Sequence, residues 1–354
     1  MSKYDRYIFL PSFSLEPNKV TSYNSVFIRD REKNEIRSIH DLKSKRTLGH
    51  ESTKTETSIV RKAHNFTISD NAYRTLKRRI NWLYYLSKSK QVTTYTGKNI
   101  YNFKMAFITL TLPSKQRTCT KDVTNQLLNP FLIELRRITK MENYVWRLEF
   151  QENGNAHYHL VTDTYVDYLL IRRLWNRILK NNGYIKPYQE KFSKLNLSEY
   201  NKLTNPQGKT EFKIIAQRYA KGKAENWEQP PSVDVKSVIS NNAISNYISK
   251  YFSKTDEKKP LKNEHDNAEN SENLRLWFCS RSLSKLKSIS GFCEAVLYDI
   301  FALVSYAEKK RKVISKFAIT TYFDITSIQG KARKFISMLL KDYSIKQGYI
   351  PAKT

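Results

Sequence analysis

Residues 144–162, YVWRLEFQENGNAHYHLVT, carry the clearest structural pattern in this chain. Two runs rich in β-branched and aromatic residues flank Asn153-Gly154-Asn155, a pattern typical of two antiparallel strands joined by a tight turn. Side chains two residues apart on a strand point to the same face, so His157 and His159 are expected side by side. The stretch therefore predicts a hairpin that presents two imidazoles on one face.

The length of the turn decides whether an acidic residue joins them, because a slip of one residue reverses every side chain. A two-residue turn at Asn153-Gly154 directs Glu149 away from the histidines. A three-residue turn over 153–155 places Glu149 opposite His159, on the face of both imidazoles. We favour this register because it gathers a ligand set that suits Mn²⁺ well and Mg²⁺ moderately. The plain alternative is a pair of half-buried strand histidines with no metal.

A second pattern lies in residues 242–254, which have the spacing of an amphipathic helix. Its polar side repeats the sequence Y-x-S-K, with Tyr247 and Lys250 followed by Tyr251 and Lys254. Residues four apart share a helix face, so both phenols are expected next to both ammonium groups. Such ammonium groups favour the phenolate and bind phosphate. The alternative is that these tyrosines only pack against the core.

The overall charge points to a polyanionic partner. Lysine and arginine number 62 against 33 acidic residues, a net charge of +29, and 23 tyrosines and 17 phenylalanines are interleaved with them. Basic groups follow phosphates and aromatic faces stack on bases, which favours nucleic acid over an acidic membrane surface. Three scattered cysteines without a C-x-x-C pair predict no cysteine zinc site and suit a reducing cytoplasm. Without an apolar signal core or spanning segment, we expect a cytoplasmic protein with no membrane partner.

The order of expected elements predicts an α+β fold, a central antiparallel sheet with helices packed on one face. We expect three regions: a basic N-terminal arm and helix (1–95), a central domain (96–285) with a loop-rich insertion at about 181–231, and a C-terminal α/β extension (286–354). The expected strands are 104–112, 144–151, 157–162, 232–238, 274–279 and 317–325. The expected helices are 71–87, one beginning near Pro130 and ending at 139, 166–179, 242–254, 292–308 and 331–342.

These motifs resemble those of the HUH endonucleases, specifically the rolling-circle replication initiators (Rep proteins) with two tyrosines found in small single-stranded-DNA phages. The resemblance covers about 104–281 and includes one departure, the polar-tipped Tyr158 where many members carry an apolar residue. It is carried by FITLTLP (107–113) as the first motif, His157-Tyr158-His159 with Glu149 as the second, Tyr247 and Lys250 as the third, and LWFCSR (276–281) downstream.

The resemblance implies metal-dependent nicking and joining of single-stranded origin DNA in a bacterial host cell. In that reading Glu149, His157 and His159 hold the metal, and Tyr247 attacks to leave a 3′-OH and a 5′-phosphotyrosine. Tyr251 then serves a second transfer, assisted by lysines 250 and 254. A host helicase and DNA polymerase are the other implied partners. The residues expected to contact DNA are Thr109, Thr111, Arg147, Lys236 and Arg281, with sheet packing an equally open role for the two threonines.

Two alternatives stay open. One is a two-tyrosine transposase of the same superfamily, which uses the same chemistry. The other is a basic nucleic-acid-binding protein without catalysis, which needs no metal cluster. A plasmid relaxase fits less well, because relaxases place tyrosine before the histidine motif. The chain has no G-x-x-x-x-G-K-[ST] sequence, so we expect no attached P-loop helicase.

Overall fold

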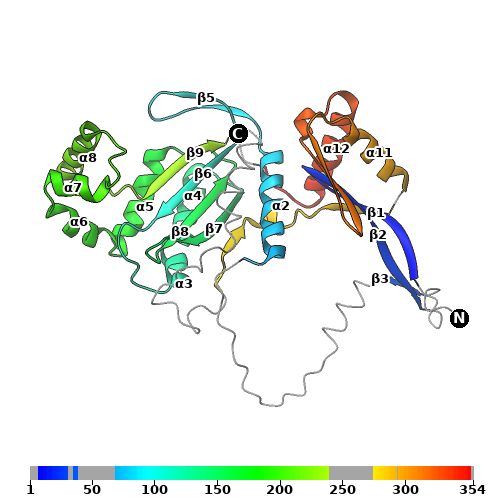
Figure 1. The fold of residues 1–354 in the computed structure, drawn as a ribbon, viewed down its shortest axis with the longest axis horizontal. Helices are drawn as coiled ribbons and strands as arrows, with labels where there is room; N and C mark the ends of the chain where they lie inside the picture. Colours follow the sequence, from blue (N-terminus) through cyan, green and yellow to red (C-terminus); the bar gives the residue numbers. More distant parts are fainter. Residues whose placement is uncertain (1–6, 31–34, 39–67, 239–273, 293, 352–354) are drawn as a thin grey trace, which may run out of the picture. The chain divides into compact units, whose positions relative to one another are not determined.

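The computed structural model describes residues 7–30, 35–38, 68–238, 274–292 and 294–351 (Figure 1). The chain divides into two compact units. One unit comprises residues 62–284 and 350–354, and it contains the histidine hairpin. The other combines residues 1–61 with 285–349, the two ends of the chain. Each unit is described by itself.

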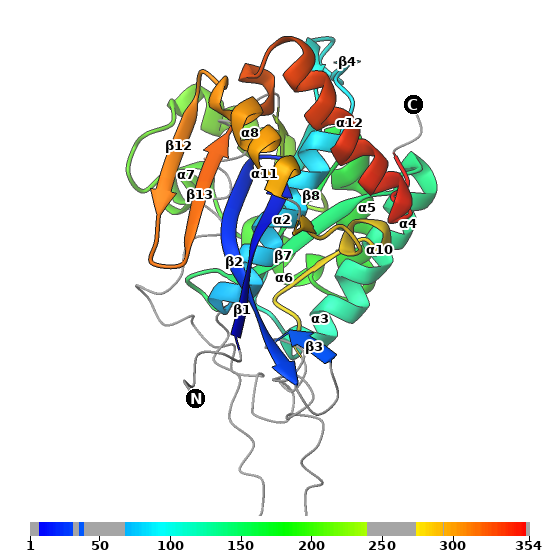
Figure 2. The ribbon, with the colours of Figure 1, turned by 90° about the vertical axis from the view of Figure 1, so that its right-hand side faces the viewer.

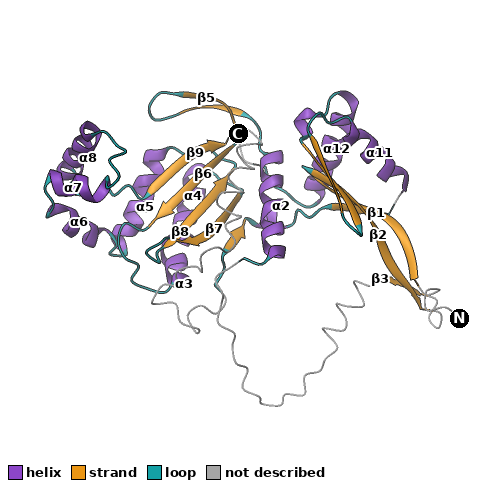
Figure 3. Cartoon of the chain, in the orientation of Figure 1, coloured by secondary structure: helices purple, strands orange, loops and turns teal. Residues whose placement is uncertain are grey.

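The unit with the histidines is built on a five-stranded antiparallel sheet, which establishes the α+β class (Figures 1 and 3). The strand order is β10-β7-β8-β6-β9, so β8 with its histidines lies at the centre. The strands are β6 (Met105–Thr111), β7 (Tyr144–Phe150), β8 (Ala156–Thr162), β9 (Val233–Val238) and β10 (Trp277–Cys279). A separate hairpin is formed by β4 (Lys90–Thr93) and β5 (Asn99–Phe103), and the short helix α10 (Arg281–Ser284) follows β10.

Helices cover both faces of this sheet, whereas we expected them on one. On one face, α4 (Asn129–Thr139) and α5 (Tyr168–Asn181) pack together, with the rings of Phe131 and Trp175 edge to face at 5.5 Å. On the other face, α2 (Asp70–Leu86) lies against β7, where its Tyr73 is close to Arg147. Apolar side chains at Leu76, Ile80 and Leu83 explain this second layer, because a buried helical stripe needs a partner surface.

The helix expected to begin near Pro130 begins ten residues earlier. It starts with α3 (Thr120–Val123), continues through the π-helical turn η1 (Thr124–Leu128) and becomes α4 without a break. The amide of Asn129 donates to the carbonyl of Thr124, five residues back, so the turn is wider than an α-turn. Because proline lacks an N–H and crowds the preceding turn, this widening lets Pro130 sit inside a continuous helix.

The insertion that we expected to be loops contains three short helices, α6 (Ile185–Ser193), α7 (Leu197–Thr204) and α8 (Phe212–Ala224). They enclose a small core in which Tyr200, Ile215 and Trp227 are buried. Tyr188 packs at its edge, and burial raises the pKa of its phenol to about 12. Helices of 8 to 13 residues show too few turns for a reliable period, and an aromatic core does not require one.

The second unit is also antiparallel, with the strand order β11-β1-β2-β13-β12 and β3 paired to β2 (Figure 2). Residues 7–30, expected as part of a basic arm, form its two longest strands, in which Phe13, Leu15 and Val20 are buried. Its elements are β1 (Tyr7–Glu16), β2 (Lys19–Asp30), β3 (Glu35–Ser38), β11 (Ile289–Gly291), α11 (Glu294–Ser305), β12 (Lys310–Ile314), β13 (Ala318–Phe323), the 3₁₀ turn η3 (Ile325–Ser327) and α12 (Gly330–Lys346). Among the described helices of both units, none has the length and apolar character needed to cross a bilayer.

Candidate metal and nucleic-acid site

The histidine hairpin has the expected face but a different register. Glu149 lies opposite His157, not His159, and Phe150 lies opposite Ala156. The loop still has three residues, but it spans 152–154 rather than 153–155, with Gly154 at φ 80°. The shift is two residues, so the side chains keep their faces and Glu149 shares a face with both histidines.

Asn155 explains the register, because its side chain is used elsewhere. Its carboxamide accepts from the amide of Gln116 and donates to the carbonyl of Ser114, both at 2.8 Å. The Gln116 side chain in turn accepts from the amide of Ala156 at 2.8 Å. Asn155 is 1% exposed, so the residue that we assigned to the loop is a buried clamp at the start of β8.

Glu149 and His159 form the closest polar pair of the site. Oε2 of Glu149 lies 3.2 Å from Nε2 of His159, reaching diagonally across the two strands. The rings of His157 and His159 are 4.6 Å apart between centroids and nearly perpendicular. Phe107 of β6 stacks on His159 at 5.4 Å, which fixes the plane of that imidazole. His159 is buried, whereas Glu149 and His157 are half-buried and accessible from solvent.

Two threonines on β6 support the two imidazoles from behind. Thr109 lies opposite His159 and Thr111 opposite His157, and their hydroxyls are 3.3 and 3.2 Å from the respective Nδ1 atoms. When Nδ1–H donates to the threonine oxygen, Nε2 carries the lone pair that a metal requires. The equivalent contacts hold both rings in one tautomer and one orientation.

Arg147 is the next residue on this face and lies opposite His159. Its Nε is 3.8 Å from Oε1 of Glu149, and the side chain is buried. On α2, burial raises the pKa of the Tyr73 phenol, while the charge of Arg147 lowers it. Arg147 therefore lies beneath α2 and beside the carboxylate, and its position suits the orientation of Glu149 better than an exposed contact with DNA.

The donor set fits a divalent cation in part. Two ligand atoms at ~2.1 Å from one ion and at right angles are ~3 Å apart, close to the separation of the Glu149 and His159 atoms. Oε1 of Glu149 is buried and has no hydrogen-bond partner among the described residues. Within that part of the chain, no group of three His, Cys, Asp or Glu side chains is arranged around one ion. His157 therefore has to turn toward the Glu149–His159 pair to become a third ligand.

Cysteine takes no part in this site. Cys279 of β10 points to the same face at the sheet edge, and burial raises the pKa of its thiol to about 11 while the charge of Arg79 lowers it. The thiol therefore stays protonated at neutral pH and is neither a nucleophile nor a metal ligand there.

The other predicted residues are placed less closely. Lys236 of β9 lies on the same face opposite Phe107, is exposed, and has its Nζ 3.1 Å from Asp234. Arg281 opens α10 beyond the edge strand β10, and its side chain is exposed. The predicted nucleophile residues Tyr247, Lys250, Tyr251 and Lys254 lie outside the described residues, so their roles stay predictions.

Sequence reasoning missed how the first motif serves the second. We gave Thr109 and Thr111 to DNA or to sheet packing, and the structure directs their hydroxyls at the imidazoles. The signal was the matching i, i+2 spacing of the two threonines and the two histidines, because antiparallel neighbours with equal spacing can pair in register. The stacking of Phe107 follows from the same alignment.

The fold and the hairpin define an α+β protein whose central antiparallel sheet presents two imidazoles and a carboxylate beside an open face. A family model described as the replication-associated protein ORF2 matches residues 105–256. The match begins with β6, contains the histidine hairpin and extends past both predicted tyrosines, and it supports a replication initiator protein. No curated protein and no solved structure matches the chain.

Proposed function

We propose that the protein initiates rolling-circle replication by nicking and rejoining single-stranded origin DNA. The observation that carries the proposal is the 3.2 Å approach of Glu149 to His159, with His157 beside them and both imidazoles supported by threonines. The match to a replication-associated family over the same residues supports it. The net charge of +29 suits a nucleic-acid substrate.

Glu149, His157 and His159 are the residues that would hold Mn²⁺ or Mg²⁺. When bound, such an ion withdraws charge from the oxygens of the scissile phosphate. The threonine hydroxyls keep Nδ1 of each imidazole occupied, so that Nε2 faces the substrate side. Arg147 keeps the carboxylate of Glu149 in place through their 3.8 Å approach.

Tyr247 is the proposed first nucleophile. Its phenol oxygen forms a bond to phosphorus, the bond from phosphorus to the 3′-oxygen breaks, and that oxygen takes a proton and leaves as the 3′-OH. Lys250 and Lys254 favour the phenolate and neutralise the phosphate. The reaction exchanges one phosphodiester for another, so the reverse step rejoins DNA without ATP.

Tyr251 is proposed to make the second transfer after a host DNA polymerase has extended the 3′-OH, with a host helicase opening the duplex. The regenerated junction is cut by Tyr251, and the new 3′-OH releases the first phosphotyrosine. Exposed Lys236 on the histidine face is the proposed contact to the strand entering the site. The proposed location is the cytoplasm of a bacterial host cell.

The test is the cleavage of end-labelled single-stranded oligonucleotides that tile the origin, with Mn²⁺ or with chelator. We expect a shortened 3′-OH product and a protein–DNA adduct that requires the metal. Tyr247→Phe or Tyr251→Phe alone is expected to leave some adduct, and the double variant none. Tyr101→Phe, at an exposed position on β5, is the matched control. Tight binding without any cleavage of the origin strand would instead favour the non-catalytic alternative.

A further inference from the structure

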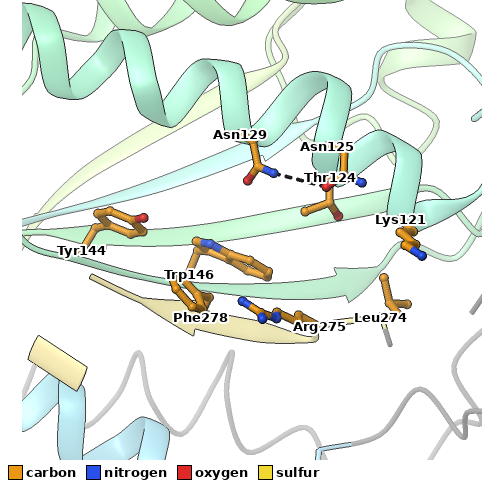
Figure 4. Close-up of a pocket in the computed structure, with 9 residues that line it drawn as sticks. All are labelled: Lys121, Thr124, Asn125, Asn129, Tyr144, Trp146, Leu274, Arg275 and Phe278. Carbon is orange, nitrogen blue, oxygen red and sulfur yellow. Dashed lines mark hydrogen bonds between the residues drawn. The ribbon is translucent and has the colours of Figure 1, made fainter. Parts of the chain in front are cut away.

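A second concave site lies on the face of the sheet opposite the histidines (Figure 4). It is a cleft of about 230 Å³ between the strands β7 and β10 and the helical segment 121–129. Residues of even number on β7 point into it, whereas Arg147 and Glu149 point to the histidine face. The residues that matter for the argument are Tyr144, Trp146, Phe278, Arg275, Asn125 and Asn129.

The floor of the cleft is aromatic. Trp146 and Phe278 are directly paired across β7 and β10, with their ring centroids 6.4 Å apart and their planes inclined by 37°. Trp146 is buried and held by an edge-to-face contact with Tyr158 at 6.1 Å, whereas Phe278 is 38% exposed. The guanidinium of Arg275 lies over the Phe278 ring at 5.2 Å. A flat ring can therefore stack on Phe278 beside a fixed indole and a cation.

The opposite wall is polar, and the π-helical turn shapes it. The side-chain amide nitrogen of Asn129 donates to the side-chain oxygen of Asn125 at 3.2 Å, as Figure 4 shows. That bond leaves the Asn125 nitrogen as a donor and the Asn129 oxygen as an acceptor, both on exposed side chains. Adjacent donor and acceptor groups match the hydrogen-bonding edge of a nucleobase. Lys121 adds an exposed ammonium at the rim.

We propose that this cleft binds one nucleobase, stacked on Phe278 and hydrogen-bonded by Asn125 and Asn129, with Lys121 and Arg275 beside its phosphate. The cleft is smaller than the ~300 Å³ at which pockets for drug-sized ligands begin, which suits a single base. Aromatic stacking with flanking cations is how proteins hold unpaired bases. π-helical turns also occur frequently at functional sites.

The same chemistry can come from two sources, a free nucleotide or an unpaired base within a DNA strand. Either source is independent of the proposed nicking, because neither needs the histidines or a metal. Binding is therefore measured in the presence of a chelator. A failure of base binding and a failure of strand cleavage are then separate results.

The experiment compares the full-length protein with Phe278→Ala and Asn125→Ala. Deoxynucleoside monophosphates are titrated calorimetrically, and labelled single-stranded 12-mers are titrated by fluorescence anisotropy. The matched controls are Tyr101→Ala for the lost ring and Asn153→Ala for the lost amide, both exposed residues away from the cleft. Melting temperatures establish that each variant is folded, and Asn125→Ala, at an exposed position, tests the cleft if Phe278→Ala unfolds the edge strand.

We expect about a tenfold or greater loss of affinity in Phe278→Ala, the magnitude typical of one stacked base. A loss for monophosphates identifies a free nucleotide as the ligand. A loss confined to 12-mers, and absent when one base is replaced by an abasic position, identifies a base of the strand. The proposal is overturned if both cleft variants bind every probe as tightly as the two controls.

Discussion

At His159, two neighbours act on the two nitrogens of one ring. Thr109 contacts Nδ1 at 3.3 Å and Glu149 contacts Nε2 at 3.2 Å. In the absence of metal, a proton has to lie between the imidazole and the carboxylate, because two lone pairs repel each other at that distance. A bound cation takes the place of that proton, which is how metal sites couple to protonation.

The threonine contacts lead to a first prediction at the residue scale. Thr109→Val and Thr111→Val keep the shape of the side chain and remove the oxygen next to Nδ1. Loss of such a supporting contact typically weakens metal binding by about 10- to 100-fold, and we expect this range for each variant, measured by Mn²⁺ titration. The matched control is Thr320→Val, which breaks the Thr21–Thr320 hydroxyl contact in the other unit. Unchanged affinity in both hairpin variants would contradict the supporting role.

Tyr158 is the residue between the histidines, and its direction accounts for the departure from the family pattern. Its ring is fully buried on the opposite face, and its hydroxyl lies 2.8 Å from Oγ1 of Thr124. That threonine donates its own proton to the carbonyl of Thr120, so the phenol is the donor to Thr124. A polar tip is tolerated at this core position because it has a partner.

This geometry predicts separate effects on stability and on metal binding. Tyr158→Phe removes one buried hydrogen bond, which lowers the free energy of unfolding by about 1 kcal/mol. Urea unfolding measures the change, and Tyr101→Phe provides the exposed control. The Mn²⁺ affinity is expected to match that of the wild type. A large drop in metal affinity with no change in stability would place the phenol in the site, against our assignment.

At the scale of the element, the β7–β8 turn is held by side chains rather than by its loop alone. Asn155 and Gln116 together tie the start of β8 to the segment that follows β6. The position of His157, two residues further on, depends on this clamp. We therefore treat the turn and the metal hairpin as one element.

The clamp predicts unequal effects of two asparagines in one turn. Asn155→Ala leaves the carbonyl of Ser114 and the amide of Gln116 without their partner, which costs about 2 to 4 kcal/mol of unfolding free energy. Asn153→Ala removes only an exposed bond to the Asn155 amide and costs about 1 kcal/mol or less. Chemical denaturation of both variants provides the comparison. Equal losses would show that the turn is not held by Asn155.

Local patterns predicted most strands and helices of the central region, because alternation and helical spacing are properties of neighbouring residues. They predicted the face of Glu149 but not its partner, since the turn is set by hydrogen bonds from Asn155 to residues about forty positions away. The aromatic helices of the insertion escaped notice for lack of a period. The direction of the threonine hydroxyls required the pairing of β6 with β8, which a single strand cannot reveal.

At the scale of the whole molecule, pairing between the ends of the chain is the feature furthest from any local pattern. β2 pairs with β13, so that Val20 lies opposite Thr321. The apolar alternation in residues 7–16 was visible in the sequence, but its partner strand was not. We had grouped the chain ends as separate regions, and the structure joins them in one sheet.

The net charge of +29 predicts how binding responds to salt. Each phosphate neutralised on single-stranded DNA contributes about −0.7 to the slope of log affinity against log salt, so several contacts give a loss of about a hundredfold between ~50 and ~200 mM. Anisotropy titrations of an origin oligonucleotide measure the slope. A flat response would mean that the excess charge lies away from the DNA.

The claim on which the account depends is that Glu149, His157 and His159 hold one ion. Pulsed electron paramagnetic resonance of the Mn²⁺-loaded protein counts the histidine nitrogens bound to the metal. We predict two in the wild type and one in His157→Ala, because His157 turns toward the Glu149–His159 pair when the ion binds. A signal from one nitrogen that His157→Ala leaves unchanged, or no nitrogen signal at all, would contradict the account.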